Sequence, residues 1–322
     1  MSSLDLPRVL VTSYATPTTG IDLLRPKCNL TIMPGVENAR EQVLKVLPGH
    51  DAVFLVGHHK VDSEFLDVAG PNLKVVSTMS AGYEHLNVPE IKRRGIKIGH
   101  TPKVVSAAVA EIAIFLMLSA AKRAYEGRAA LEQNQVKSGP QWLLGQELRG
   151  STVGIFGLGN IGQAIVKRLV GFEVERFIYT GHSRKKAGDE LGAIFVSFDD
   201  LLKQSDYLVV AAPLTNETKG LFDDSVFDKM KKTSIFVNIA RGQIVNTDSL
   251  VRALRNKKIF AAGLDVTDPE PLPPYHELLK LPNAEITPHL GSGTTKTRND
   301  MSTIAAQNIL NGLEGKPLVY PL

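Results

Sequence analysis

The chain has 322 residues, of which 43% are hydrophobic and 22% charged, so its composition excludes a disordered protein. At roughly 150 residues per domain the length predicts two domains, with one large domain as the alternative. The formal charge of +4 does not indicate a nucleic-acid-binding protein, because the basic residues form no long run. Cys28 is the only cysteine, which excludes an internal disulfide and a cysteine-based zinc site.

Neither end of the chain resembles a targeting signal. Residues 1–7 contain no apolar run, and the final tripeptide, ending in Leu322, is not a peroxisomal address. The sequence therefore predicts a cytoplasmic protein. Residues 104–121 are almost wholly apolar, but Glu111 would be costly inside a membrane. We expect a buried helix between two packed layers there, with membrane contact as the alternative.

Short, continuously apolar runs recur along the chain, as expected for strands that are buried on both faces. The first set comprises residues 9–12, 30–33, 52–56, 74–78 and 97–99. The second set comprises residues 152–156, 177–180, 207–212, 234–239, 261–266 and 285–287. Spacers long enough for helices separate the runs, and this alternation predicts two parallel α/β sheets. The Ala-rich helix near 104–125 and a polar loop at 133–150 separate the two sets.

A glycine-rich turn follows the first strand of the second set. Gly157, Gly159 and Gly162 match the dinucleotide-binding pattern: the first for a tight turn, the second for close approach of a pyrophosphate, the third for helix packing. Asn160 and Ile161 begin the helix whose free N–H groups would face the phosphates. The alternative is an ordinary glycine-rich turn, but the strand–turn–helix–strand context favours dinucleotide binding.

The end of the next strand indicates which dinucleotide binds. An NAD site usually has an acidic residue there, about 20 residues after the glycines, but this chain has Gly181. A hydroxyl and cationic groups follow that could bind a 2′-phosphate, in the segment His182, Ser183, Arg184 and Lys185. The alternative is a solvated basic loop. We expect NADP(H) to be preferred, with NAD(H) possible.

Three polar residues follow later strands, at the sheet edge where ligands bind in parallel α/β folds. Arg241 offers a bidentate cation to a keto acid, and His289 could donate a proton to the alkoxide that forms on hydride addition. A buried Glu270 beside the imidazole would favour its charged form and orient the ring. Individually, the three could be a surface ion pair, a solvated acid and a core histidine; together they predict a catalytic site.

These segments resemble the D-isomer-specific 2-hydroxyacid dehydrogenases, and within them the reductases of glyoxylate and hydroxypyruvate, over almost the whole chain. The spacings of 29 residues from Arg241 to Glu270 and 19 from Glu270 to His289 are more specific than the glycines. The other matching segments are residues 77–85, 157–162, 179–184, 238–242, 261–272 and 288–292. The resemblance implies NADPH-dependent reduction of small 2-keto acids, glyoxylate to glycolate and hydroxypyruvate to D-glycerate.

The resemblance also implies an architecture. It consists of two Rossmann-like or flavodoxin-like parallel-sheet lobes, with the active site in the cleft. The substrate-binding domain would be discontinuous, formed by residues 1–103 and 290–322, and the NADP-binding domain would span 104–289. A homodimer is implied, with the helix at 104–121 in the crossover region.

Further site residues follow from the resemblance alone. The backbone at Ala81 and Gly82 should hold the substrate carboxylate together with Arg241, and Ser292 should lie near the substrate. Trp142, the only tryptophan, would gate a neighbouring active site, with plain packing as the alternative. No metal site is expected. Four further positions match positions on the cofactor side of the active site in this family: Pro213, Ile239, Asp265 and Gly291.

Two other functions fit parts of the sequence. A dinucleotide-sensing transcriptional corepressor of the same fold would carry a similar triad, but no long extension follows Pro321 and the acid used to sense NAD is missing. Another D-2-hydroxyacid dehydrogenase or a formate dehydrogenase is the third interpretation. Formate dehydrogenases have a glutamine where Glu270 stands, and phosphoglycerate enzymes usually append regulatory domains.

Overall fold

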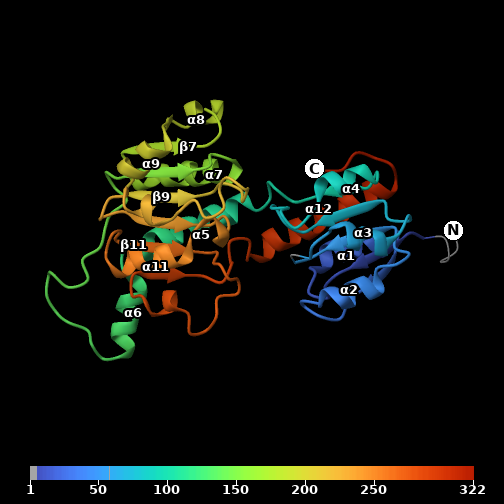
Figure 1. The fold of residues 1–322 in the computed structure, drawn as a ribbon, viewed down its shortest axis with the longest axis horizontal. Helices are drawn as coiled ribbons and strands as arrows, with labels where there is room; N and C mark the ends of the chain where they lie inside the picture. The colour runs from blue at the N-terminus through green and yellow to red at the C-terminus, as the bar shows by residue number, and fades with distance from the viewer. Residues whose placement is uncertain (1–5, 58) are drawn as a thin grey trace. The chain divides into compact units, whose positions relative to one another are not determined.

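The computed structural model describes residues 6–57 and 59–322, so most of the N-terminal segment considered for targeting lies outside the described residues. The chain forms two compact units. Unit 1 comprises Met1–Val105 and Gly293–Leu322, and unit 2 comprises Ser106–Ser292 (Figure 1). The chain thus leaves unit 1, forms unit 2 and returns to unit 1.

Unit 1 contains a five-stranded parallel sheet in the order β2-β1-β3-β4-β5, the flavodoxin-like order. Every residue of β3 and β4 is buried, which explains why these strands read as unbroken apolar runs. The strands are β1 Arg8–Val11, β2 Asn29–Ile32, β3 Ala52–Leu55, β4 Val75–Thr78 and β5 Lys97–Gly99. The helices are α1 Thr18–Leu24, α2 Arg40–Val46, α3 Ser63–Ala69, α4 Val88–Arg93 and α12 Thr295–Leu313.

Helix α12 comes from the far end of the chain and completes unit 1. It packs on β3, β4 and β5 and lies beside α1. Small residues allow this close approach. A Cβ at Gly20 would lie 2.3 Å from the Ser302 hydroxyl, and one at Gly99 would lie 2.6 Å from the Asn308 amide.

Unit 2 contains a seven-stranded parallel sheet in the order β12-β11-β10-β9-β6-β7-β8. The strand order reverses between β6 and β9, which is where doubly wound sheets bind ligands. The strands are β6 Thr152–Phe156, β7 Arg176–Thr180, β8 Ala193–Phe195, β9 Tyr207–Val210, β10 Ile235–Asn238, β11 Ala261–Leu264 and β12 Ala284–Ile286. The helices and 3₁₀ turns are α5 Ser106–Ala121, α6 Ala124–Glu132, α7 Asn160–Leu169, η1 Val170–Phe172, α8 Lys186–Glu190, α9 Phe198–Gln204, α10 Asp224–Phe227, η2 Gly242–Ile244, α11 Thr247–Arg255 and η3 Glu277–Lys280.

The predicted α/β class with two parallel-sheet lobes is confirmed, and all eleven predicted strands are present with small shifts at their ends. One strand was missed. β8 is a three-residue edge strand in which Ile194 and Phe195 are 52% and 38% exposed, so it lacks the apolar signal of a buried strand.

The apolar segment at 104–121 forms α5, which packs against α7 and against β10, β11 and β12. The helix ends at Ala121, and α6 begins after Arg123, whose backbone is left-handed (φ 55°). The predicted single helix to residue 125 is therefore two helices, and α6 with the loop after it projects from the body of unit 2 (Figure 1). Among residues 6–57 and 59–322 we find no helix with the length and apolar character needed to span a membrane.

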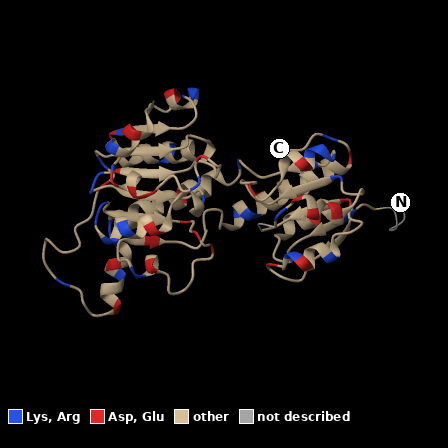
Figure 2. Cartoon of the chain, in the orientation of Figure 1, with Lys and Arg blue, Asp and Glu red and all other residues tan. Residues whose placement is uncertain are grey.

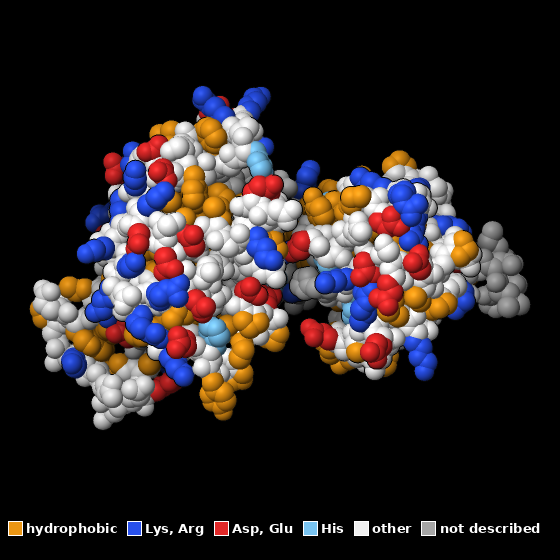
Figure 3. Space-filling model, viewed as in Figure 1, with side chains coloured by type: hydrophobic (Ala, Val, Ile, Leu, Met, Phe, Trp, Pro, Cys, Tyr) orange, Lys and Arg blue, Asp and Glu red, His pale blue; other side chains and the backbone are white. Residues whose placement is uncertain are grey.

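Charged side chains are distributed over both units. Lys and Arg alternate with Asp and Glu along the ribbon (Figure 2), and the face drawn in Figure 3 mixes both signs with apolar side chains. Many of the charges form ion pairs within one helix or between neighbouring elements, such as Arg94 with Glu90 and Arg252 with Asp224.

Candidate active site

The glycine-rich turn has the geometry of a phosphate-binding site. Gly157 adopts φ 101°, and a Cβ there would lie 2.7 Å from the backbone of Ala212. A Cβ at Gly162 would lie 2.6 Å from the Gly157 carbonyl, whereas one at Gly159 would meet open space. Two glycines thus permit tight packing and the third keeps the approach to the helix clear. The N-cap Gly159 offers no side-chain cap, so the first N–H groups of α7, at Asn160 and Ile161, face this open space.

The segment after β7 carries the predicted residues for a 2′-phosphate. Gly181, His182, Ser183, Arg184 and Lys185 are all exposed, and a Cβ at Gly181 would meet nothing within 4 Å. The Lys185 N–H donates to the Tyr179 hydroxyl at 2.7 Å, which fixes the path of the segment. In this structure the Arg184 guanidinium pairs with Asp189 of α8 at 2.7 Å. That pair is exposed, so it is weak and a phosphate could compete with the carboxylate for Arg184.

Two other predicted cofactor residues follow strands near the reversal of strand order. Pro213 is exposed after β9, three residues beyond its end, and Ile239 is 6% exposed directly after β10. The close approach of Gly157 to Ala212 brings the segment before Pro213 against the glycine-rich turn. The structure thus places the loop after β9 beside the turn after β6, at the carboxyl edge of the sheet.

Arg241 lies at the same edge, three residues beyond the end of β10. Its backbone is extended (φ −146°, ψ 141°), and the Asn238 side chain donates to its carbonyl at 2.9 Å while accepting from the Ala240 N–H at 3.1 Å. The next residue, Gly242, touches the loop after β11: a Cβ there would lie 1.9 Å from the Thr267 carbonyl. This contact brings the Arg241 segment against the loop that carries Glu270.

Glu270 and His289 are in direct contact. The Nδ1 atom of His289 lies 2.6 Å from Oε1 of Glu270, and the other carboxylate oxygen accepts the Thr267 N–H at 3.2 Å. The expected buried carboxylate is not found: the Glu270 and His289 side chains are 36% and 35% exposed. The pair stands at the surface of unit 2, where the contact orients the imidazole.

Asp265 holds the loop on which His289 stands. Its carboxylate is 2% exposed and accepts from the Thr287 hydroxyl at 2.7 Å, the Leu290 N–H at 2.7 Å and the Gly291 N–H at 2.8 Å. The His289 N–H also donates to the Asp265 carbonyl at 2.9 Å, and His289 itself adopts a left-handed backbone (φ 54°). The sequence analysis identified Asp265 only as a residue on the cofactor side of the site. Nothing in the spacing of the sequence predicted the hydrogen bonds that its carboxylate accepts.

The predicted carboxylate-binding residues lie in unit 1, in the loop after β4. The carbonyl of Ala81 accepts from His100 Nδ1 at 3.1 Å, and the carbonyl of Gly82 accepts from the Ser80 hydroxyl at 2.6 Å. Thr78 bonds the Ser80 hydroxyl in turn, at 2.9 Å. Burial lowers the pKa of His100, so the ring is neutral at pH 7 and donates through Nδ1–H. Sequence reasoning missed His100 and Ser80, although Ser80 lies within a matching segment.

The remaining predicted residues are placed as follows. Gly291 is buried and Ser292 partly buried, directly after the His289 loop. Trp142 is partly buried in the loop between α6 and β6, where its backbone N–H donates to the Gly139 carbonyl at 3.3 Å. No cluster of three metal-ligating side chains occurs in the described part of the chain.

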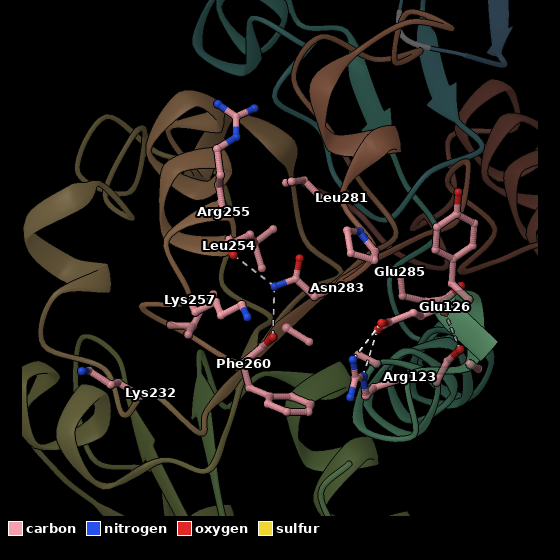
Figure 4. A pocket seen from close by; sticks show the side chains of 17 residues that line it. Arg123, Glu126, Lys232, Leu254, Arg255, Lys257, Phe260, Leu281, Asn283 and Glu285 are labelled. Carbon is pink, nitrogen blue, oxygen red and sulfur yellow. Dashed lines mark hydrogen bonds and ion pairs between the residues drawn. The ribbon is translucent and has the colours of Figure 1, made fainter. Parts of the chain in front are cut away.

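A pocket of about 580 Å³ lies elsewhere in unit 2, before the amino ends of β11 and β12 (Figure 4). Arg123 pairs with Glu126 at 2.8 Å on one side of it, and Asn283 donates to the Leu254 and Phe260 carbonyls on the other. This is the opposite edge of the sheet from the glycine-rich turn and Arg241. The pocket is therefore separate from the candidate active site.

Comparison with known proteins places these features in a family. The sequence model of the D-isomer specific 2-hydroxyacid dehydrogenase NAD-binding domain matches residues 114–291. A human protein named glyoxylate reductase/hydroxypyruvate reductase is 50% identical over 287 residues, covering 87% of this chain and 86% of its own. The glyoxylate reductase of Thermofilum pendens is 38% identical, covering 96% and 92%.

Solved structures agree over nearly the full length. A protein from Thermus thermophilus superposes with a TM-score of 0.91 at 39% identity, covering 98% of this chain and 99% of its own. An NADPH-dependent glyoxylate/hydroxypyruvate reductase from Sinorhizobium meliloti, solved with NADP and malonate, superposes at 0.85 with 28% identity, covering 98% and 96%. The resemblance noted from the motifs is confirmed, and the chain belongs to the D-isomer specific 2-hydroxyacid dehydrogenases, a family of nicotinamide-dinucleotide-dependent oxidoreductases.

Proposed function

We propose that this protein is an NADPH-dependent reductase of small 2-keto acids, with glyoxylate and hydroxypyruvate as substrates. The observation that carries the proposal is the 2.6 Å contact of His289 with Glu270 at the same sheet edge as the glycine-rich turn and Arg241. An oriented imidazole, a nearby guanidinium and a dinucleotide cradle are the groups that reduction of a keto acid requires. The names of the human and archaeal relatives support the substrate class.

The residues of this chain have separate roles in the proposed reaction. NADPH, when bound, supplies the hydride. Arg241 would bind the keto acid and stabilise negative charge on the ketone oxygen, because a guanidinium offers paired donors to such oxygens. His289 would transfer the proton on its Nε2 to that oxygen, while Glu270 keeps Nδ1 protonated and fixes the ring. Asp265 holds the His289 loop in place throughout.

A substrate panel tests the function. We expect purified enzyme to consume NADPH, followed by its absorbance, with glyoxylate and hydroxypyruvate, and to do so faster with NADPH than with NADH. The preference follows from the missing acid at Gly181 and the exposed Arg184 beside it. In the same assay, Gly181→Asp combined with Arg184→Ala should move the preference toward NADH, because the added carboxylate would repel a 2′-phosphate and bind a ribose hydroxyl.

The double variant should change the cofactor preference without disturbing the fold. Gly181 is exposed, and a new side chain there meets no atom within 4 Å, so the fold should tolerate aspartate. Gly171→Asp is a matched control, since its Cβ also meets open space in η1. A wild-type enzyme that works better with NADH would contradict the NADP assignment. Failure to reduce any 2-keto acid with either cofactor would contradict the function itself.

A second prediction concerns Glu270. Glu270→Gln keeps the shape of the side chain but removes the negative charge 2.6 Å from Nδ1, so His289 loses its charged hydrogen-bond partner. We expect kcat/KM for glyoxylate reduction to fall by about tenfold or more, while the Kd of NADPH stays unchanged.

The control is Glu277→Gln, which removes an exposed carboxylate paired with Arg255 at 3.0 Å in the same unit. Its kcat/KM should match the wild type. A Glu270→Gln enzyme that stays folded and binds NADPH but keeps the wild-type kcat/KM would show that Glu270 does not support His289 in the reaction.

A homodimer is part of the proposal. The segment from α5 to the loop after α6 carries exposed apolar side chains that a second copy would cover, among them Phe115, Tyr125, Leu131 and Leu144, which are 45–66% exposed. Trp142 lies in the same loop, and we propose that it gates the partner's active site. The cytoplasmic location stays a prediction.

A further inference from the structure

Three successive carbonyl groups accept hydrogen bonds in the loop that follows β4 of unit 1. The Ser80 carbonyl accepts the Thr101 N–H at 2.9 Å, and the Ala81 carbonyl accepts from His100 Nδ1 at 3.1 Å. The Gly82 carbonyl accepts from the Ser80 hydroxyl at 2.6 Å. Two of these three donors come from the segment directly after β5, so that segment determines which way the loop turns its carbonyls.

The direction of the carbonyls also sets the direction of the N–H groups. A trans peptide group is planar, so the carbonyl of one residue and the N–H of the next point to opposite sides of the chain. The bond from His100 to the Ala81 carbonyl therefore turns the Gly82 N–H to the side opposite His100. Residues 79–83 belong to no helix or strand, so side-chain bonds of this kind must hold the orientation.

The His100 side chain is a neutral donor with a fixed ring. A carbonyl can only accept, so the proton on the ring is carried by Nδ1. Burial lowers the pKa of His100, which leaves the ring uncharged at pH 7. The ring also packs against Tyr83 in a T-shaped arrangement, with centroids 5.7 Å apart and planes at 86°. These contacts leave the imidazole little freedom to turn away from the Ala81 carbonyl.

The backbone of His100 is held by α12 and by residues 319–321. Its N–H donates to the Tyr320 carbonyl at 3.1 Å, and its carbonyl accepts from the Asn308 amide at 3.3 Å. Asn308 is fully buried in α12, and its amide oxygen accepts the N–H groups of Val319 and Tyr320 at 2.9 and 3.2 Å. His100 thus stands on a backbone that is bonded on both sides, while the loop it contacts is irregular.

We infer that His100 is a positioning residue, which acts through the Ala81 carbonyl to hold the loop after β4 in the orientation that binds the 2-keto acid. This inference rests on the proposed function, in which the backbone of Ala81 and Gly82 holds the substrate carboxylate. It assigns His100 no contact with the substrate and no part in proton transfer.

The test compares two substitutions of His100 in the intact chain. His100→Leu keeps the bulk but removes the donor, so KM for glyoxylate should rise about tenfold while kcat changes little. The Kd of NADPH, followed by its fluorescence, should stay unchanged. His100→Asn places an amide N–H close to the position of Nδ1, and should therefore keep most of the wild-type affinity for glyoxylate.

Hydrogen exchange gives a second readout that does not depend on turnover. In the His100→Leu enzyme the amides of residues 79–83 should exchange faster than in wild type, because the loop has lost the bond that restrains it. In the His100→Asn enzyme their exchange should stay close to the wild-type rate.

His50→Leu is the matched control. His50 is a buried histidine of unit 1 whose Nδ1 also bonds a backbone carbonyl, that of Leu47, at 3.1 Å. It lies just before β3, at the opposite edge of the parallel sheet from the loop after β4. His50→Leu should lower Tm but leave KM and the exchange of residues 79–83 at wild-type values.

Three results would overturn the inference: a wild-type KM in His100→Leu, an equal rise of KM in His50→Leu, or a His100→Asn enzyme as impaired as His100→Leu. The last would show that the hydrogen bond is not the cause. The proposed function fails separately. If wild-type enzyme reduces no 2-keto acid while His100→Leu still speeds exchange in residues 79–83, the function is wrong and His100 still positions the loop.

Discussion

Replacing His289 with asparagine should lower kcat for glyoxylate reduction by about 100-fold or more, which is the typical contribution of a positioned general acid to the rate. Asparagine can still bond Glu270 but cannot deliver a proton to the alkoxide. The imidazole stands on the loop after β12, away from the glycine-rich turn after β6, so the Kd of NADPH should change little. Turnover by stopped-flow and NADPH binding by fluorescence would separate the two effects.

His276→Asn provides the control. His276 caps the 3₁₀ turn η3 through its Nδ1, which accepts the Leu278 N–H at 3.2 Å, and asparagine can keep that bond. The control should retain wild-type turnover. Near-full turnover in the His289→Asn enzyme would instead assign His289 a structural role and remove the proton donor from the proposed mechanism.

The second large effect is expected at Asp265. Its carboxylate is buried and accepts three hydrogen bonds, from Thr287, Leu290 and Gly291. Asp265→Ala leaves those donors without an acceptor, which should lower the free energy of unfolding by about 3 kcal/mol. The loop that carries His289 would lose its support, so kcat/KM should fall much further than the loss of stability alone explains.

Asp206→Ala separates stability from function. Asp206 also accepts a backbone N–H, that of Thr152 at 2.9 Å, and pairs with Lys231 at 2.8 Å, but it lies at the amino edge of the same sheet. Chemical denaturation and kcat/KM should be measured for both variants. If Asp265→Ala loses no more activity than Asp206→Ala below the unfolding transition, Asp265 does not position the catalytic loop.

The fold was largely predictable because its strands are buried on both faces. A run such as Thr152–Phe156, in which all five residues are buried, reads as a strand without any knowledge of its neighbours. The edge strand β8 does not, since Ile194 and Phe195 face solvent. The break at Arg123 was equally invisible, because neither glycine nor proline marks it and the left-handed backbone there depends on surrounding contacts.

The residues of the candidate site could be predicted from the sequence, but the residues and bonds that hold them in place mostly could not. Glu270 and His289 stand 19 residues apart in sequence, and their chemistry suggested the contact that the structure contains. The bonds of Asp265 join it mostly to backbone groups 25 and 26 residues later, and a backbone N–H has no sequence signature. His100 was missed for the same reason: its bond to the Ala81 carbonyl follows from how β5 folds against β4, not from any local pattern.

The discontinuity of unit 1 bears on how the protein is made. A chain emerging from the ribosome completes all of unit 2 while unit 1 still lacks α12. Until Thr295–Leu313 is synthesised, the apolar face formed by β3, β4 and β5 has no helix over it. During translation of unit 2, the sheet of unit 1 therefore lacks its cover on the face that α12 will occupy, and synthesis of the last thirty residues closes that face.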